Sequence, residues 1–280
     1  MLFDASLQQP FVGFGWGQLA SANFLVIENY PGQPGLFTQS HNLILDLILW
    51  NGYPLGLLAV AVLAWWLWKA GSFVRDFSQL HLMAFVLVLG IHAMLEFPLQ
   101  YAFFLLPFGL IVGALHTSLG FRTVLKSKKW IHIVISLLSI IVLAITIRDY
   151  FRVETSFYGL RFEHRKIETD IPSTPPNVVA LTQFRDYLLF ARNVPRSGLN
   201  ASDLGWMIDV VNTIPSAHII YKLAANLAMN GRLSEAAHWL AIICKTMAAP
   251  NCQAMRETWE TEALANKGMA DVTWPEEFSP

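Results

Sequence analysis

Apolar residues are distributed unevenly along this chain. From about Leu43 to Ile147 they form a nearly continuous stretch broken by short polar gaps, whereas the remainder has the mixed composition of a water-exposed domain. A helix needs about 20 mainly apolar residues to cross the hydrocarbon core of a membrane. The stretch resolves into candidate spans at about Leu43–Trp68 (interrupted by NGYPLG), Leu80–Leu95, Tyr101–Leu119 and Trp130–Ile147. The pattern predicts an all-α fold with a membrane domain of four transmembrane helices over 43–147.

The segment before these spans, residues 1–42, reads as an irregular loop. It contains GFGWGQ at Gly13–Gln18 and the turn-rich NYPGQPG, in which Pro and Gly interrupt regular structure. GFGWGQ lacks the spacing of a phosphate-binding loop and the strand before it, so a tight turn or a close backbone approach explains it better than nucleotide binding. A loop of this length is usually either functional or disordered.

Residues 148–280, after the spans, read as short amphipathic helices. The part from 223 to 250 predicts a helical hairpin of the tetratricopeptide type, with Gly231 at the turn and Ala236 and Leu240 packing inward. One such hairpin cannot bury its own core, so neighbouring helices must complete the stack. Two interpretations stay open, a surface for another protein or the membrane half, and a packed helical cap without a partner.

Lys and Arg predict the orientation, because they are enriched in cytoplasmic loops. Lys69 and Arg75 lie between the first two spans, and Arg122, Lys126, Lys128 and Lys129 between the last two. Residues 1–42 have no Lys or Arg. We therefore expect a multi-pass protein of the bacterial inner membrane, with 1–42 as a periplasmic loop and 148–280 as a periplasmic domain. Arg148 and Arg152, just beyond the fourth span, weaken this assignment slightly.

Composition agrees with a membrane protein and excludes some partners. Hydrophobic residues make up 54% of the chain and charged residues 14%, against about 25% charged in soluble domains. The net charge of −1 and the few outward basic residues argue against nucleic-acid binding. Cys244 and Cys252 could form a disulfide in an oxidising periplasm, or remain two buried thiols.

The first candidate site is SHNLILD, where the first span begins. His41 lies at the water boundary and can exchange a proton near neutral pH, although a lone interfacial His can equally cap a helix. Asn42 adds a polar group, and Asp46 is an ionisable residue near or inside a span, where it usually faces a cavity or a partner. Because His41 and Asp46 are five residues apart, a direct dyad on one helix face is not favoured.

The second candidate site is HAMLEFPLQY, at the outer end of the second span. His92 and Glu96 have i,i+4 spacing and would share a helix face before Pro98 breaks the helix and Tyr101 opens the next one. The pair is either part of a site within reach of His41, or two residues that bind each other and have only a structural role. A zinc site is not favoured, because the chain has neither HExxH nor a Cys cluster.

The order of GFGWGQ, a Pro/Gly loop, the SHN motif with GYPLG after it, and then HAMLEFPLQYAFFLLP resembles the O-antigen ligase and polymerase superfamily. In particular it is similar to the PglL-type protein O-oligosaccharyltransferases, which combine these motifs with an outer helical domain. The resemblance implies transfer of a glycan en bloc from undecaprenyl pyrophosphate to a Ser or Thr hydroxyl of a pilin-like periplasmic protein, without a metal or cofactor. His41 matches the essential outer-loop His, as base or activator. Asn42, His92, Glu96 and Tyr101 match residues that would line the same substrate cavity.

Two other readings stay open. One is an O-antigen ligase or polymerase of the same superfamily that acts on lipid-linked glycans. The other is a membrane scaffold without activity, whose helical hairpin binds a partner. Family members have about a dozen spans and carry their pyrophosphate-binding Arg residues mostly upstream of the GFGWGQ region, whereas this chain has no basic residue before Lys69. We therefore expect it to be the C-terminal part of a longer enzyme.

We predict that these 280 residues alone transfer no glycan. Membranes that contain only this chain, incubated with a lipid-linked glycan and an acceptor protein, should leave the acceptor mass unchanged. A glycosylated acceptor would contradict the prediction.

Overall fold

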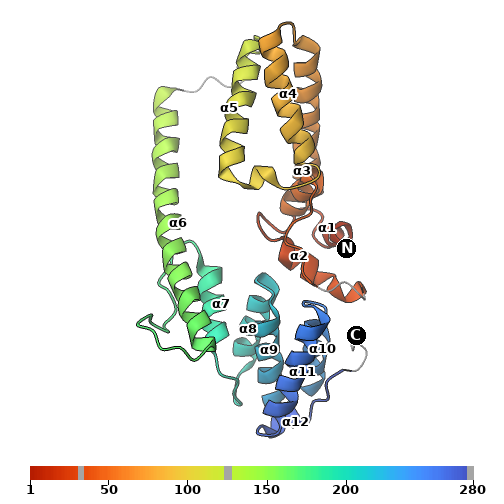
Figure 1. Cartoon of the computed structure of the whole chain (residues 1–280), viewed down its shortest axis with the longest axis vertical. Helices are drawn as coiled ribbons and strands as arrows, with labels where there is room; N and C mark the ends of the chain where they lie inside the picture. Colours follow the sequence, from red (N-terminus) through yellow and green to blue (C-terminus); the bar gives the residue numbers. More distant parts are fainter. Residues whose placement is uncertain (31–34, 123–127, 276–280) are drawn as a thin grey trace. The chain divides into compact units, whose positions relative to one another are not determined.

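The computed structural model describes residues 1–30, 35–122 and 128–275, and the regular structure in these ranges is helical throughout, as predicted (Figure 1). The chain forms two compact units, one of residues 1–26 and 37–126 and one of residues 27–36 and 127–280. The expected domain boundary at 147/148 falls inside a single helix, α6 (Lys129–His164). Lys126, counted above in the second basic gap, lies outside the described residues, as does the centre of NYPGQPG.

The first unit is built around apolar helices. Its elements are α1 (Leu2–Gln8), α2 (Leu19–Leu25), α3 (Leu43–Phe73), α4 (Phe77–His92), the short 3-10 helix η2 (Pro98–Gln100) and α5 (Ala102–Ser118). Helices α4 and α5 pack on each other, with a buried core of Ala70, Met83, Val86 and Leu115. The Trp66 Nε1–H group of α3 donates to His116 Nδ1 of α5 at 3.1 Å. This hydrogen bond joins α3 to α5.

Two of the described helices, not four, are long and apolar enough to cross a membrane: α3, with 31 residues, and α6, with 36. Helices α4 and α5, with 16 and 17 residues, are apolar but about 24–26 Å long, short of the roughly 30 Å of a hydrocarbon core. None of the most apolar 18-residue window of α6 is buried. An exposed apolar surface of this size is stable in lipid and costly in water, which indicates a membrane protein.

Helix α3 breaks at Gly52, within the interruption seen in the sequence. Gly52 has φ 73° and ψ 171°, a backbone conformation that is essentially restricted to glycine. A Cβ built on Gly56 would lie 2.8 Å from the Ile48 Cα, whereas residues eight apart in a straight helix are about 12 Å apart. The helix therefore bends sharply at Gly52, so that Ile48 of the half-helix 43–51 lies against Gly56 of the half-helix 53–73.

The GFGWGQ loop closes this break with backbone hydrogen bonds. The Phe14 N–H group donates to the Leu49 carbonyl at 2.7 Å, and the Gly15 N–H group to the Trp50 carbonyl at 3.1 Å. These carbonyls end the first half-helix and have lost their helical partners. On the other side of the break, the Tyr53 N–H group donates to the Pro10 carbonyl at 2.7 Å. The loop thus satisfies polar groups from both half-helices.

Glycines make this close approach possible. A Cβ on Gly13 would lie 2.5 Å from the Gly52 nitrogen, and a Cβ on Gly52 would lie 2.4 Å from the Phe11 carbonyl group. The ring of Trp16 stacks on Trp50 with centroids 4.6 Å apart. The sequence reading of GFGWGQ as a close backbone approach is therefore confirmed.

The second unit consists of α6 and a set of shorter helices. They are α7 (Thr182–Arg192), α8 (Ala201–Thr213), α9 (Ala217–Met229), α10 (Leu233–Ile243), α11 (Ala249–Ala263) and α12 (Lys267–Ala270). The 3-10 helix η1 (Ile27–Asn29) also belongs here. Glu28 pairs with His238 of α10 at 3.3 Å, and its carbonyl accepts from Lys245 Nζ at 2.8 Å, so the unit holds this loop by its own side chains.

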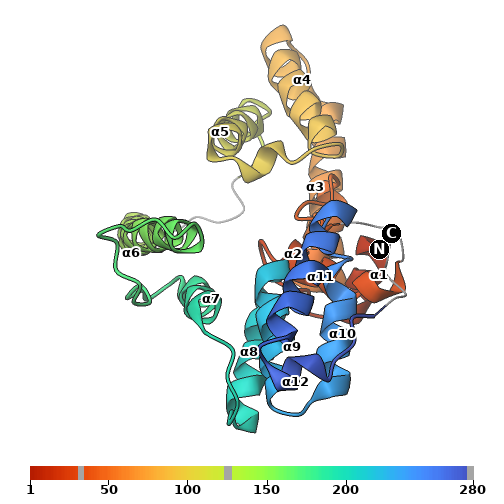
Figure 2. The same ribbon diagram turned by 60° about the horizontal axis from the view of Figure 1, so that its bottom comes forward.

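Helices α9 and α10 form the expected hairpin and lie side by side (Figure 2). Gly231 makes the turn with φ 76°, and Ala236 and Leu240 are fully buried. Helix α12 packs on α9 as well, where a Cβ on Gly268 would lie 2.9 Å from the Met229 Cα. The hairpin is thus observed, and its kinship to tetratricopeptide repeats stays a prediction.

A polar ladder on α9 fixes the connection between α7 and α8. Lys222 Nζ donates to the Ala191 and Asn193 carbonyls at 2.6 and 2.7 Å, and burial lowers the Lys222 pKa. One and two turns further on, the side-chain oxygens of Asn226 and Asn230 accept from backbone N–H groups of the same connection. The ladder orders an irregular segment that buries few apolar side chains.

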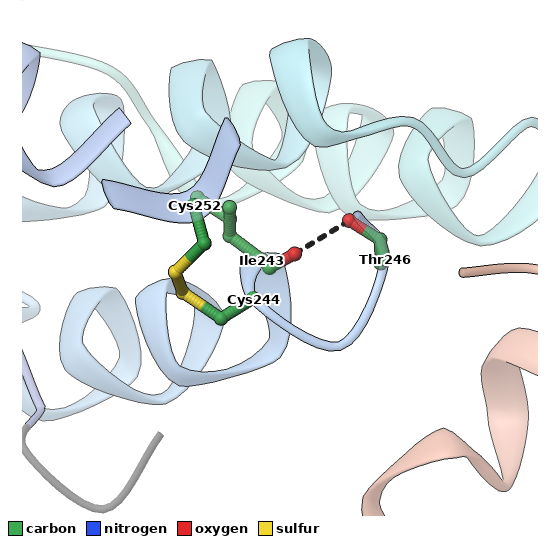
Figure 3. The surroundings of a disulfide bond; sticks show 4 residues. All are labelled: Ile243, Cys244, Thr246 and Cys252. Carbon is green, nitrogen blue, oxygen red and sulfur yellow. Dashed lines mark hydrogen bonds between the residues drawn. A yellow bond between two sulfur atoms is a disulfide. The ribbon is translucent and has the colours of Figure 1, made fainter. Parts of the chain in front are cut away.

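Cys244 and Cys252 are joined by a disulfide in the structure (Figure 3). Their Cα atoms are 5.0 Å apart, within the usual range for a disulfide. Cys244 caps the end of α10 and Cys252 lies in the first turn of α11. The Thr246 hydroxyl donates to the Ile243 carbonyl at 2.7 Å in the turn between them. The bond therefore fixes the exit of the α9–α10 hairpin.

We predict that Gly52→Ala and Gly13→Ala prevent stable folding, because each added Cβ would overlap backbone atoms across the break. Gly17→Ala is the matched control, since Gly17 also has a positive φ, 76°, but nothing within 4 Å of an added Cβ, and it should cost only about 1–2 kcal/mol of backbone strain. The measurement is the amount of folded chain extracted from membranes and its melting temperature. Equal losses in all three variants would contradict the role of the loop.

We predict that the chain isolated from cell membranes without reductant carries no free thiol. Denatured without reductant and treated with N-ethylmaleimide, it should keep its mass, and after reduction it should gain two maleimide groups, one for each cysteine. Two groups added without reductant would favour two unpaired thiols instead.

Candidate functional site

His41 lies at the start of the first half-helix of α3. Asn42 is the N-cap, and its side-chain oxygen accepts from the Ile44 and Leu45 N–H groups at 3.0 and 3.1 Å. The Leu43 N–H group donates to the Ala93 carbonyl at 3.0 Å, just after the end of α4. Asn42 therefore has a structural role here, and the helix start is fixed against the second candidate motif.

The structure brings His41 and Glu96 together. His41 Nδ1 lies 3.1 Å from Glu96 Oε2, and each side chain is about half exposed, 52% and 51%. A carboxylate at Nδ1 fixes the ring orientation and leaves Nε2 free of this contact. Both groups therefore remain accessible to a substrate.

His92 and Glu96 do not share a helix face as their spacing suggested. Helix α4 ends at His92, and Glu96 lies in the following turn, where its N–H group donates to the His92 carbonyl at 2.8 Å. Among the described residues, Glu96 forms an ion pair with His41, and no ion pair joins it to His92. The His92 ring instead packs edge-on against Phe104, with centroids 6.3 Å apart. Glu96 of the second motif therefore pairs with His41 of the first motif, SHNLILD.

Aromatic rings line one side of the pair. Phe97 packs edge-on against His41, with centroids 5.3 Å apart. Tyr101 is the N-cap residue of α5. Its ring centroid lies 5.8 Å from that of Phe97, and its ring stacks on Phe103 with centroids 5.2 Å apart. Tyr101 is 45% exposed, and its ring contacts Phe97, which in turn contacts His41. Its hydroxyl is therefore accessible and is not part of the ion pair.

Asp46 does not form a dyad with His41. Its carboxylate accepts from the Ser40 hydroxyl at 2.5 Å and from Gln100 Nε2 at 3.4 Å. Asp46 is buried, 4% exposed. Sequence reasoning did not identify Ser40 and Gln100. Ser40 carries the weak signal of a hydroxyl beside the motif His, whereas Gln100 is 54 residues from Asp46 and carries none.

The chemistry that this arrangement supports is proton transfer. An imidazole oriented by a carboxylate is the arrangement by which many enzymes activate a hydroxyl nucleophile. Among the described residues, no group of three or more His, Cys, Asp and Glu side chains is close enough together to hold a metal ion. The His41–Glu96 pair is thus an accessible acid–base pair that the first unit offers to a substrate hydroxyl.

Comparisons with known proteins give two relatives that are named O-oligosaccharyltransferases. The General O-oligosaccharyltransferase of Acinetobacter baylyi is 28% identical over 245 residues, which cover 86% of this chain and 42% of the relative. The ComP-specific O-oligosaccharyltransferase of the same organism is 37% identical over 117 residues, 42% of this chain and 21% of the relative. The chain thus spans less than half the length of these relatives. No solved structure matches.

A family model described as virulence factor membrane-bound polymerase, C-terminal, matches residues 80–246, more than half of the chain. The match includes His92, Glu96, Tyr101 and the α9–α10 hairpin, and begins after His41. The chain therefore belongs to this family of membrane-bound polymerases, whose relatives include the O-oligosaccharyltransferases.

Proposed function

We propose that this chain carries the His41-centred part of an O-oligosaccharyltransferase active site. The donor is a glycan on undecaprenyl pyrophosphate, and the acceptor is a Ser or Thr hydroxyl of a pilin-like periplasmic protein. The observation that carries the proposal is the His41–Glu96 pair at 3.1 Å, which unites the two motifs in one accessible acid–base group. The names of the two relatives support transfer to protein.

In the proposed reaction, His41 Nε2 accepts the proton of the acceptor hydroxyl. The hydroxyl oxygen then bonds to the anomeric carbon of the glycan, as the bond from that carbon to the pyrophosphate oxygen breaks. Glu96 stabilises the imidazolium that forms at His41, because it lies at the opposite ring nitrogen. Undecaprenyl pyrophosphate leaves, and the imidazolium returns its proton to solvent.

The site belongs at the periplasmic surface of the inner membrane in this proposal. The half-helix 53–73 is about 31 Å long, which matches a hydrocarbon core. Lys69 lies near its far end, and Arg75 follows it, so that end is cytoplasmic by the positive-inside rule. His41 then lies at the outer boundary. The Cys244–Cys252 disulfide supports an oxidising compartment for the second unit.

The second unit has a different task in this proposal. The α9–α10 hairpin, with Ala236 and Leu240 buried in its packing, belongs to a periplasmic tetratricopeptide-like domain that contacts the acceptor protein. Helices of this kind expose one face while they bury the other. The disulfide at the end of α10 keeps that face rigid.

A second candidate function is an O-antigen ligase or polymerase that acts on lipid-linked glycans. The family description, a membrane-bound polymerase, favours it. The His41–Glu96 pair suits either reaction, because both activate a hydroxyl of the acceptor. The two functions are distinguished by where the glycan is found, on the acceptor protein or in the lipid fraction.

We predict that His41→Ala lowers transfer by about 10²–10⁴-fold, the usual contribution of a general base. The measurement is the intact mass of a pilin-type acceptor co-expressed with the glycan pathway and the gene product at its full encoded length. His81→Ala is the control, since His81 is an exposed histidine of α4 whose ring bonds the Phe77 carbonyl of its own helix. A glycan-sized mass that survives His41→Ala would return His41 to a structural role, and glycan found only on lipid would select the second function.

A further inference from the structure

The backbone at His41 is unusual for its residue type. His41 has φ 54°, in the left-handed region that non-glycine residues adopt rarely. Such a conformation persists only where the surrounding structure enforces it, and it is often found at functional sites. Something adjacent to His41 must therefore hold its backbone.

Ser40 provides this restraint. Its hydroxyl oxygen accepts from the Asn42 N–H group at 3.1 Å, so one side chain bridges the two residues that flank His41. A hydroxyl has one proton to donate. Its two acceptors are the Asn42 carbonyl at 2.9 Å and the Asp46 carboxylate at 2.5 Å. The charged and nearer carboxylate is the stronger of the two.

Asp46 is the fixed end of this chain of hydrogen bonds. It lies one turn into α3, is 4% exposed, and also accepts from Gln100 Nε2 at 3.4 Å. Gln100 lies in η2, four residues after Glu96. A buried carboxylate is costly unless hydrogen bonds satisfy it. Ser40 precedes His41 and Gln100 follows Glu96, so both of these side-chain partners lead to the two residues of the candidate site.

We infer that Asp46 is a positioning residue for His41, acting through Ser40, and that Gln100 ties it to the segment that carries Glu96. Asp46 sets the direction of the Ser40 hydroxyl, Ser40 holds the backbone of His41 in the left-handed region, and the ring then meets Glu96. Asp46 itself does not touch substrate. The inference rests on the proposed function only in taking His41 as the base.

The test is a set of matched variants of the full-length gene product in the transfer assay. Asp46→Ala and Ser40→Ala should each lower kcat by about 10–100-fold, the cost of a misplaced catalytic group, with little change in KM. Asp46→Asn should keep most of the activity, because its amide oxygen still accepts from Ser40 and Gln100 can turn its own amide so that Oε1 accepts from the new NH2 group. The double variant Ser40→Ala/Asp46→Ala should be no slower than the slower single variant, because both act along one path.

Two outcomes would overturn the inference. If Asp46→Asn is as slow as Asp46→Ala while Ser40→Ala is unaffected, Asp46 acts through its charge and not through Ser40. If the single losses multiply in the double variant, the two residues act independently. Membrane levels of each variant, measured in parallel, separate slow enzymes from unfolded ones.

A second readout needs no substrate and so separates this inference from the proposed function. Diethyl pyrocarbonate modifies accessible histidines, and peptide mass spectrometry gives the rate at His41. Asp46→Ala and Ser40→Ala should raise that rate severalfold, because they release the His41 ring from Glu96. Asp46→Asn should leave the rate at His41 unchanged. The rate at His81, measured in the same samples, is the internal reference. Equal rates at His41 in all variants would overturn the positioning role. A wild-type enzyme that glycosylates neither protein nor lipid would instead overturn the proposed function.

Discussion

The break in α3 at Gly52 is the constraint on which the rest of the first unit depends. It divides one long apolar helix into a short half-helix and a half-helix of spanning length, which are joined by a sharp bend. Broken helical hydrogen bonds are expensive wherever water is scarce. The loop 10–15 satisfies them with three backbone hydrogen bonds, to Leu49, Trp50 and Tyr53. With the break closed in this way, the short half-helix begins directly after His41 and its cap, Asn42.

The two motifs then meet by contacts of three different kinds. A backbone hydrogen bond joins Leu43 to Ala93, an ion pair joins His41 to Glu96, and a buried carboxylate, Asp46, accepts from Gln100. Each contact links segments about 50 residues apart in the chain. The combination leaves His41 and Glu96 half exposed while their supports are buried or paired. That division suits a site in which a rigid inner layer orients two groups that must remain open to a substrate.

Hydrophobic periodicity was sufficient to predict the helical class and the hairpin at Gly231. Motif order named His41 and Glu96 as site candidates, and the structure brings these two side chains together. Neither periodicity nor motif order was sufficient to predict how these residues pair. The i,i+4 spacing of His92 and Glu96 predicts one helix face, but α4 ends at His92, and the turn redirects Glu96 to His41. The expectation of four spans stays a prediction for α4 and α5, because hydropathy marks apolar residues, whereas helix length depends on where caps and turns stop the helix, and these two apolar helices are shorter than α3 and α6. The Gln100–Asp46 contact arises from packing alone.

The central claim is that His41 and Glu96 act as one acid–base unit, and a double-mutant cycle tests it most directly. Transfer rates would be measured for His41→Ala, Glu96→Ala and the combined variant, each at matched levels in the membrane. If the two residues act together, Glu96→Ala slows the wild-type enzyme but costs nothing further once His41 is removed. Independent losses that multiply in the combined variant would show that the contact at 3.1 Å is not the functional unit.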